Sequence, residues 1–163
     1  MTRWFKHLLA DARLRREFPR TTLDAIHRAV AAGEKRHRGQ VCFAIEQGLP
    51  LAALARRQTP RDRAHDAFAQ LRVWDTHHNS GVLIYVLIAE HAIEIVADRG
   101  IAARVGQAEW QAVCERMRER FAAGEFERGA LEGVNAVSDI LAREFPGDGS
   151  ARDNELADEP IIL

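Results

Sequence analysis

The sequence predicts a single α/β domain built on a mixed β-sheet. The chain has 163 residues, and a domain of this size buries about two thirds of the surface that its unfolded chain would expose. Short apolar segments rich in strand-forming residues alternate with longer segments of helical periodicity. Two of the apolar segments, residues 82–89 and 91–97, follow one another so closely that they predict an antiparallel hairpin.

The first residues predict an amphipathic helix. Apolar side chains such as Trp4 and Leu8 recur among cationic residues from residue 4 to residue 17, and Pro19 ends the helix. Because the apolar stripe is short, we interpret residues 1–18 as a helix that packs on the domain. Contact of this helix with a membrane surface or with a partner is the alternative.

A helix, a strand and a second helix are expected next. Thr21 is placed to cap a helix that ends at Gly39. Residues 41–45, VCFAI, are rich in strand formers and predict the first strand. Thr59 and Pro60 form an N-cap and first-turn pair, which predicts a helix that ends near residue 74.

The segment GVLIYVLIAE, residues 81–90, predicts the central strand. It is almost continuously apolar, which is typical of a strand that is buried on both faces. Residues 91–97 are expected to return antiparallel to this strand, so the sheet is predicted to be mixed.

Two further helices complete the predicted domain. The first runs from Gln107 to Gly124, where a glycine can end the helix in a left-handed turn. The second begins near Phe126, and its Gly129 and Gly133 allow a neighbouring element to approach closely.

The chain is thus divided into an N-terminal helix (1–18), an α/β domain (19–146) and a flexible acidic tail (147–163). The tail ends in the apolar residues 160–163, PIIL. These side chains either fold back on the domain or engage another protein, for example as an added strand. The two alternatives are evenly balanced.

Composition excludes several classes of function. The net charge is −1 and aromatic residues do not alternate with basic ones, so no nucleic acid is expected as a partner. The longest apolar run, residues 82–89, is less than half of the ~20 residues that a membrane helix needs. The first residues lack the apolar core of a secretory signal. Cys42 and Cys114 are far apart and are interpreted as buried structural thiols in a reducing compartment, so we expect a soluble cytoplasmic protein.

Four features of residues 20–146 occur together in one known family. They are Asn79-x-Gly81 before the central strand, the hairpin, the turn at residues 98–100, and the paired helices. In this combination the chain resembles the TPM domain family, known from thylakoid-lumen and photosystem-repair proteins, and looks like a small soluble bacterial member. The resemblance implies an α/β/α sandwich with a polar site where loops meet at one end of the sheet. We expect the protein to differ from many members in lacking a transmembrane anchor, and it has Asp-Arg-Gly at residues 98–100 in place of Thr-Gly-Tyr-Gly.

The resemblance also implies a metal site. Asp75, Asn79 and Asp98 match the family's polar positions. Calcium takes about six to eight oxygen ligands, and two carboxylates, an amide and backbone carbonyls suit Ca²⁺ or another divalent cation. Asp75 and Asn79 can equally shape the turn before the strand, and this is the preferred interpretation.

Zinc is a weaker alternative at the same loop. His77 and His78 follow Asp75, and imidazole and carboxylate groups suit zinc. Adjacent histidines in an extended segment point to opposite faces, so we do not expect them to bind one ion together.

We therefore expect a noncatalytic interaction or assembly module of the TPM type, with calcium binding as an option. The loop cluster and the tail would contact a protein partner. The alternative is a divalent-metal-dependent phosphatase, because some relatives are described as phosphatases. In that case Asp75 or Asp98 would act as nucleophile or metal ligand, and Arg99 would hold the phosphate. The sequence contains no complete catalytic motif.

Overall fold

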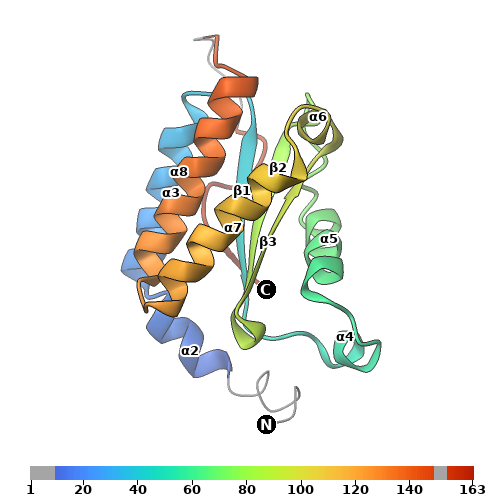
Figure 1. Ribbon diagram of the computed structural model, residues 1–163, viewed down its shortest axis with the longest axis vertical. Coiled ribbons are helices and arrows are strands. Elements are labelled where there is room, and N and C mark those ends of the chain that lie inside the picture. Colours follow the sequence, from blue (N-terminus) through green and yellow to red (C-terminus); the bar gives the residue numbers. More distant parts are fainter. Residues whose placement is uncertain (1–9, 149–153) are drawn as a thin grey trace.

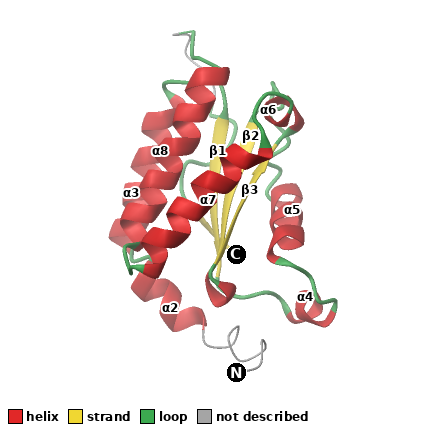
Figure 2. Ribbon diagram, in the orientation of Figure 1, coloured by secondary structure: helices red, strands yellow, loops and turns green. Residues whose placement is uncertain are grey.

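The computed structural model describes residues 10–148 and 154–163 and shows an α/β/α sandwich. A mixed sheet lies in the middle, with helices on both faces (Figure 1). Colouring by secondary structure shows the three layers, with the strands between two groups of helices (Figure 2). The predicted α/β fold with a mixed sheet is confirmed.

The helical elements of the described residues are seven α-helices and one 3-10 turn. They are α2 (Ala10–Glu17), α3 (Arg20–Glu34), α4 (Leu51–Ala55), α5 (Pro60–Gln70), the 3-10 turn η1 (Ile88–Glu90), α6 (Arg99–Ala102), α7 (Gln107–Ala122) and α8 (Phe126–Glu144).

Four strands form one sheet in the order β3-β2-β1-β4. They are β1 (Gln40–Glu46), β2 (Gly81–Leu87), β3 (Ala92–Ala97) and β4 (Ile161–Ile162). β1 runs parallel to β2 and to β4, whereas β2 and β3 are antiparallel. In the parallel pair Gln40 lies opposite Gly81 and Glu46 opposite Leu87, so the sheet has an amino end and a carboxyl end for these two strands.

The alternation of side chains along the strands creates two cores. Phe43 and Ile84 belong to the core under α2, α3, α7 and α8. Ala44 and Tyr85 belong to the core under α4 and α5. Every residue of β2 is buried, which confirms the prediction of a central strand.

The hairpin is confirmed, but its turn differs from the prediction. β2 ends at Leu87, and the next three residues form η1 instead of continuing the strand to residue 89. His91 then adopts a left-handed conformation with φ of 52°, and its N–H donates to the Ile88 carbonyl. The connection is therefore longer than a two-residue turn.

Two predicted boundaries of α3 are wrong. The helix begins after Pro19, whose fixed φ suits a helix start. Thr21 does not cap it, and the neighbouring Thr22 hydroxyl instead donates to the Glu127 carboxylate of α8 at 2.8 Å. The helix ends at Glu34, five residues before Gly39.

Other local predictions are confirmed. Thr59 caps α5 as predicted, and Asp62 completes a capping box with it. Gly124 has φ of 78° after α7, as the left-handed turn requires. A Cβ atom at Gly129 would lie 2.8 Å from the Phe121 ring, and one at Gly133 would lie 2.3 Å from the Met117 sulfur. These two glycines therefore let α7 and α8 pack closely.

The two ends of the chain differ in how far the structure describes them. Residues 1–9 of the predicted N-terminal helix lie outside the described residues. Leu14 and Phe18, in and after α2, are buried in the same core as β1 and β2. Residues 154–163 lie back on the domain, and β4 adds to the edge of β1, so the fold-back alternative for the apolar end is the observed one.

Among the described residues, none of the helices has the length and apolar character to cross a membrane.

Candidate functional site

The structure brings three of the predicted site residues together at the amino end of the sheet. Asn79 lies two residues before the start of β2, and Asp98 follows β3 and accepts a hydrogen bond from Arg99 N–H at 2.7 Å. The Arg99 guanidinium donates to Asn79 Oδ1 at 3.1 and 3.2 Å. The predicted loop cluster therefore exists for Asn79, Asp98 and Arg99.

The backbone of this cluster is tightly packed. Asn79 has φ of 50°, a left-handed conformation that Asn tolerates better than most residues. A Cβ atom at Gly100 would lie 2.6 Å from the Asn79 carbonyl oxygen, so only glycine fits this close approach. The Asp98 side chain caps α6, which the sequence analysis did not predict.

Asp75 does not share this cluster. Its carboxylate accepts a hydrogen bond from the Arg72 guanidinium at 2.6 Å. It lines a hollow of about 340 Å³ with Cys42 of β1 and Ile161 of β4, whereas Asp98 follows β3 on the other side of β2. Asp75 therefore lies beside β1 and β4, and Asp98 lies beside β3, so the central strand β2 separates the two candidate carboxylates.

The cluster has a limited set of ligands for a cation. Asp98 Oδ2 is buried and has no hydrogen-bond partner, which leaves one carboxylate oxygen free for an ion. Asn79 Oδ1, the predicted amide ligand, already accepts from Arg99. In the part of the chain that the structure describes, no group of three or more His, Cys, Asp or Glu side chains is arranged to hold a metal ion.

The two histidines of the loop do not point to opposite faces as expected. The ring centroids of His77 and His78 lie 4.7 Å apart in an edge-to-face arrangement. The expectation assumed an extended segment, but Asn79 N–H donates to the Thr76 carbonyl, so the segment is a turn.

The carboxyl end of the sheet holds a buried polar network that sequence reasoning missed. Arg63 of α5 forms a salt bridge to Glu46 of β1, with nitrogen-to-oxygen distances from 2.8 to 3.0 Å. The Tyr85 hydroxyl also donates to Glu46, and burial beside this carboxylate raises the pKa of Tyr85 well above its usual value. Arg63 further donates to Gln70 at 3.2 Å. These partners are separated by 17 and 39 residues, so no local motif announces the network.

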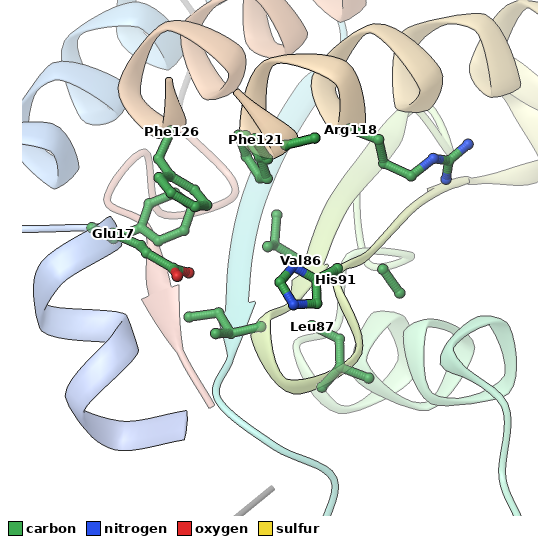
Figure 3. Close-up of a pocket in the computed structure, with 11 residues that line it drawn as sticks. Glu17, Val86, Leu87, His91, Arg118, Phe121 and Phe126 are labelled. Atoms are coloured by element: carbon green, nitrogen blue, oxygen red, sulfur yellow. The ribbon is translucent and has the colours of Figure 1, made fainter. Parts of the chain in front are cut away.

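An apolar pocket of about 250 Å³ lies at the same end of the sheet, on the opposite face. We call it the phenylalanine pocket, because Phe18, Phe121 and Phe126 line it together with Val86 and Ile88. The three rings form one cluster, with centroids 5.2 to 5.9 Å apart. Figure 3 shows Phe121 and Phe126 extending from the helices toward the space above Val86.

A few polar groups line the rim of the phenylalanine pocket. The Glu17 side chain is only 5% exposed, and its carboxylate accepts from Arg13 at 3.3 Å. Arg13 Nη2 also lies 3.2 Å from His91 Nε2, within hydrogen-bond distance. Figure 3 shows the Arg118 guanidinium extending away from the other labelled side chains, consistent with its bond to the Ile93 carbonyl at 3.3 Å.

Comparison with known families decides where the chain belongs. The family model of the TPM domain matches residues 17–140, well over half of the chain. The chain belongs to the TPM domain family. This confirms the resemblance predicted from the sequence over residues 20–146.

Two solved structures resemble this TPM domain. The BA42 protein of the psychrophilic bacterium Bizionia argentinensis is 26% identical, with a TM-score of 0.74 over 88% of this chain and 93% of that one. The N-terminal domain of a P. gingivalis protein is 19% identical, with a TM-score of 0.55 over 72% of this chain and 71% of that one, and supports the fold alone. The comparison with curated proteins gives no match.

The two thiols of the TPM domain suit a structural role. Burial raises the pKa of Cys42 to about 12 and that of Cys114 to about 11. A thiol that stays protonated at neutral pH is a poor nucleophile. Both cysteines are buried without a disulfide, as the sequence analysis expected.

Proposed function

We propose that this TPM domain is a noncatalytic interaction module that binds an apolar side chain of a partner protein in the phenylalanine pocket. The pocket itself carries the proposal, because a concave apolar site with a few polar groups at its rim is the usual form of a binding site. It lies near the carboxyl ends of β1 and β2, where open α/β sheets commonly bind their ligands.

The size and lining of the pocket define the ligand chemistry. A cavity of roughly 150 Å³ holds a benzene molecule, so the volume of about 250 Å³ suits one aromatic or branched aliphatic side chain. The cluster of three phenylalanine rings offers edge-to-face contacts to an aromatic guest. Glu17 and His91 at the rim provide acceptor and donor groups for the partner's backbone.

The test uses side-chain mimics as probes on the full chain. N-acetyl-tryptophan amide and N-acetyl-leucine amide are titrated into ¹⁵N-labelled protein, and amide shifts are recorded. We expect saturable shifts for residues 86–92 and 121–126, with a Kd on the order of 1 mM for ligands this small. N-acetyl-glutamine amide, a polar mimic of similar size, should cause no saturable shifts.

A filled pocket is the matched control. Ala122 is exposed and lies on the lining, so Ala122→Trp places a large side chain over the opening without changing the buried core. The apolar probes should no longer shift residues 86–92 in this variant. Equal shifts in wild type and Ala122→Trp, or none in wild type, would overturn the proposal.

Calcium binding at the amino end is a second candidate, favoured by the unpartnered Asp98 Oδ2. Asp98 and the backbone carbonyls around Asn79 would supply oxygen ligands, and a bound cation would displace Arg99 from Asn79 Oδ1. Calcium titration should then shift residues 79–100 in wild type and in Asp75→Ala, but not in Asp98→Asn. Shifts lost in both variants would instead restore the predicted ligand set with Asp75.

The phosphatase alternative stays a prediction. It requires Asp75, Asp98 and Arg99 in one pocket, and the ion pair of Asp75 with Arg72 does not favour it. Contact of the N-terminal helix with a membrane surface and a cytoplasmic location also stay predictions.

A further inference from the structure

The two edges of the sheet are protected in different ways. At the β3 edge, Arg61 of α5 donates to the Ile95 carbonyl at 2.6 Å. Arg118 of α7 donates to the Ile93 carbonyl at 3.3 Å. Both arginines belong to helices of the folded body, so this edge is covered by side chains and not by a separate segment of the chain.

The β1 edge is covered by a separate segment of the chain. Residues 154–163 follow a stretch outside the described residues, and β4 pairs Ile161 with Ala44 and Ile162 with Ile45. The Leu163 N–H adds a hydrogen bond to the Ile45 carbonyl at 2.9 Å. The ladder thus uses a small part of β1, which spans seven residues.

At the start of β1, the hydrogen bonds along the same edge are made by side chains instead of a neighbouring strand. The Val41 N–H donates to the Glu34 carboxyl at 2.7 Å. Gln40 Oε1 accepts from the N–H groups of Glu155 and Leu156 at 3.0 Å. The Glu155 carboxylate in turn accepts from the His77 N–H at 2.6 Å. An acidic residue at this position therefore anchors the segment to the loop before β2.

The apolar part of the segment is incompletely packed. Ile161 and Leu163 pack against the core under α4 and α5, whereas Ile162 points outward and is 41% exposed. The hollow of about 340 Å³ remains between the segment, Cys42 and Leu71. A covering strand that leaves space beneath it is held less firmly than one packed to normal density.

One contact of the segment depends on a proton. Burial and the neighbouring Asp158 carboxylate raise the pKa of Glu34 to about 8, so Glu34 can donate a hydrogen bond to Asp158 at neutral pH. The titratable groups that face Glu34 are Asp158 of the segment and the Cys42 thiol of β1. If both carboxyl groups were ionised, their charges would repel each other.

We propose that the edge of β1 is a strand-addition site for an extended segment of a partner protein, and that residues 154–163 are its exchangeable internal occupant. The partner segment carries an acidic residue that reaches His77 N–H, followed by apolar residues at alternate positions, in the pattern of Glu155, Ile161 and Leu163. This site lies at the β1 edge and is separate from the phenylalanine pocket, so either can fail without the other.

The test measures exchange in the full chain with a synthetic peptide of residues 154–163 as the probe. We expect the unlabelled peptide to shift the amides of Ala44, Ile45 and His77 in ¹⁵N-labelled protein. Ile161→Glu in the labelled chain weakens the internal competitor, so the peptide should bind this variant about tenfold tighter or more than wild type.

Ile162→Glu is the matched control, because its side chain lies next to Ile161 in the ladder but points outward. The peptide should bind this variant within about twofold of wild type, since exposed positions contribute little. A peptide with Glu at position 161 should cause no shifts.

Two outcomes would overturn the proposal. Equal peptide affinity for Ile161→Glu and wild type, with both chains folded by near-UV circular dichroism, would show that residues 154–163 do not compete for the edge. A dimer in light scattering that disappears in Ile161→Glu would show that a second copy, and not a partner protein, takes the site.

Discussion

The two ends of the sheet hold polar residues in contrasting ways. At the carboxyl end, Arg63 and Glu46 form an ion pair whose side chains are 9% and 3% exposed. At the amino end, Arg72 and Asp75 form an ion pair whose side chains are 69% and 49% exposed. The motifs noticed in the sequence mark the exposed end, whereas the buried network and the phenylalanine pocket lie at the other. Polar residues that are close in sequence draw attention, but burial is what makes a polar contact costly to break.

Breaking the buried ion pair should have the largest effect. Arg63→Met leaves the Glu46 carboxylate buried without its cation, and we expect unfolding free energy to fall by ~3–5 kcal/mol. Arg72→Met, the same change at the exposed pair, should cost at most ~1 kcal/mol. Urea unfolding of both variants measures the difference. Equal losses would mean that the two ends do not differ in the way described.

The amino end of the sheet also contains a buried ionisable group, His37, which lies just before β1. Measuring the unfolding free energy against pH shows how much this buried group matters at an end whose ion pair is exposed. Burial lowers the pKa of His37 to about 4, so this side chain stays neutral in the fold while it takes up a proton in the unfolded chain below about pH 6.5. Stability should therefore fall as pH drops from 6.5 to 4, by up to ~3 kcal/mol for this group. Above about pH 6.5, His37 is neutral in both the folded and the unfolded chain, so it causes no further change of stability with pH.

The variant His37→Asn tests this assignment. An Asn amide can still donate to the Gly39 carbonyl, as His37 Nδ1 does at 3.1 Å, but it does not titrate. Unfolding followed at pH 4, 5 and 6.5 should show a smaller loss in the variant. The same slope in both proteins would assign the acid sensitivity to other groups.

The smallest expected effect concerns the left-handed turn at Asn79. Asn79→Ala removes the contact with Arg99 and forces a Cβ-bearing residue without a polar side chain into φ of 50°, at a cost of ~1 kcal/mol. Asn79→Gly removes the same contact without that strain and should lie close to wild type. Thermal unfolding compares the two, and equal losses would show that the Arg99 contact dominates.

The two predicted helix caps, Thr59 and Thr21, had different outcomes. Thr59 caps α5 as predicted, and Asp62 three residues later completes a capping box with it. Thr21 looked equally suitable as a cap, but Pro19 starts the helix and Thr22 bonds to Glu127, 105 residues away. The sequence could not reveal that competition, because it arises where α3 packs on α8.

The candidate site shows the same limit. Asn79 and Arg99 were noticed as loop residues, and the hairpin between them brings their side chains into contact. Asp75 was placed with them because it matches a polar position of the family, yet it pairs with Arg72 and lines the hollow beside β4. Matching positions to a family did not reveal the side of β2 on which each carboxylate lies, because that depends on how the loops fold around the sheet.

The sequence by itself determined the family, the mixed sheet with its central strand, and the close packing of α7 on α8 at Gly129 and Gly133. These follow from periodicity, strand propensity and local sterics, which act over a few residues. Only the tertiary structure decided the Glu46, Arg63 and Tyr85 network, the phenylalanine pocket, and the return of residues 154–163 to the β1 edge. Each joins segments far apart in the chain, and their contacts form only when the helices and the sheet pack together.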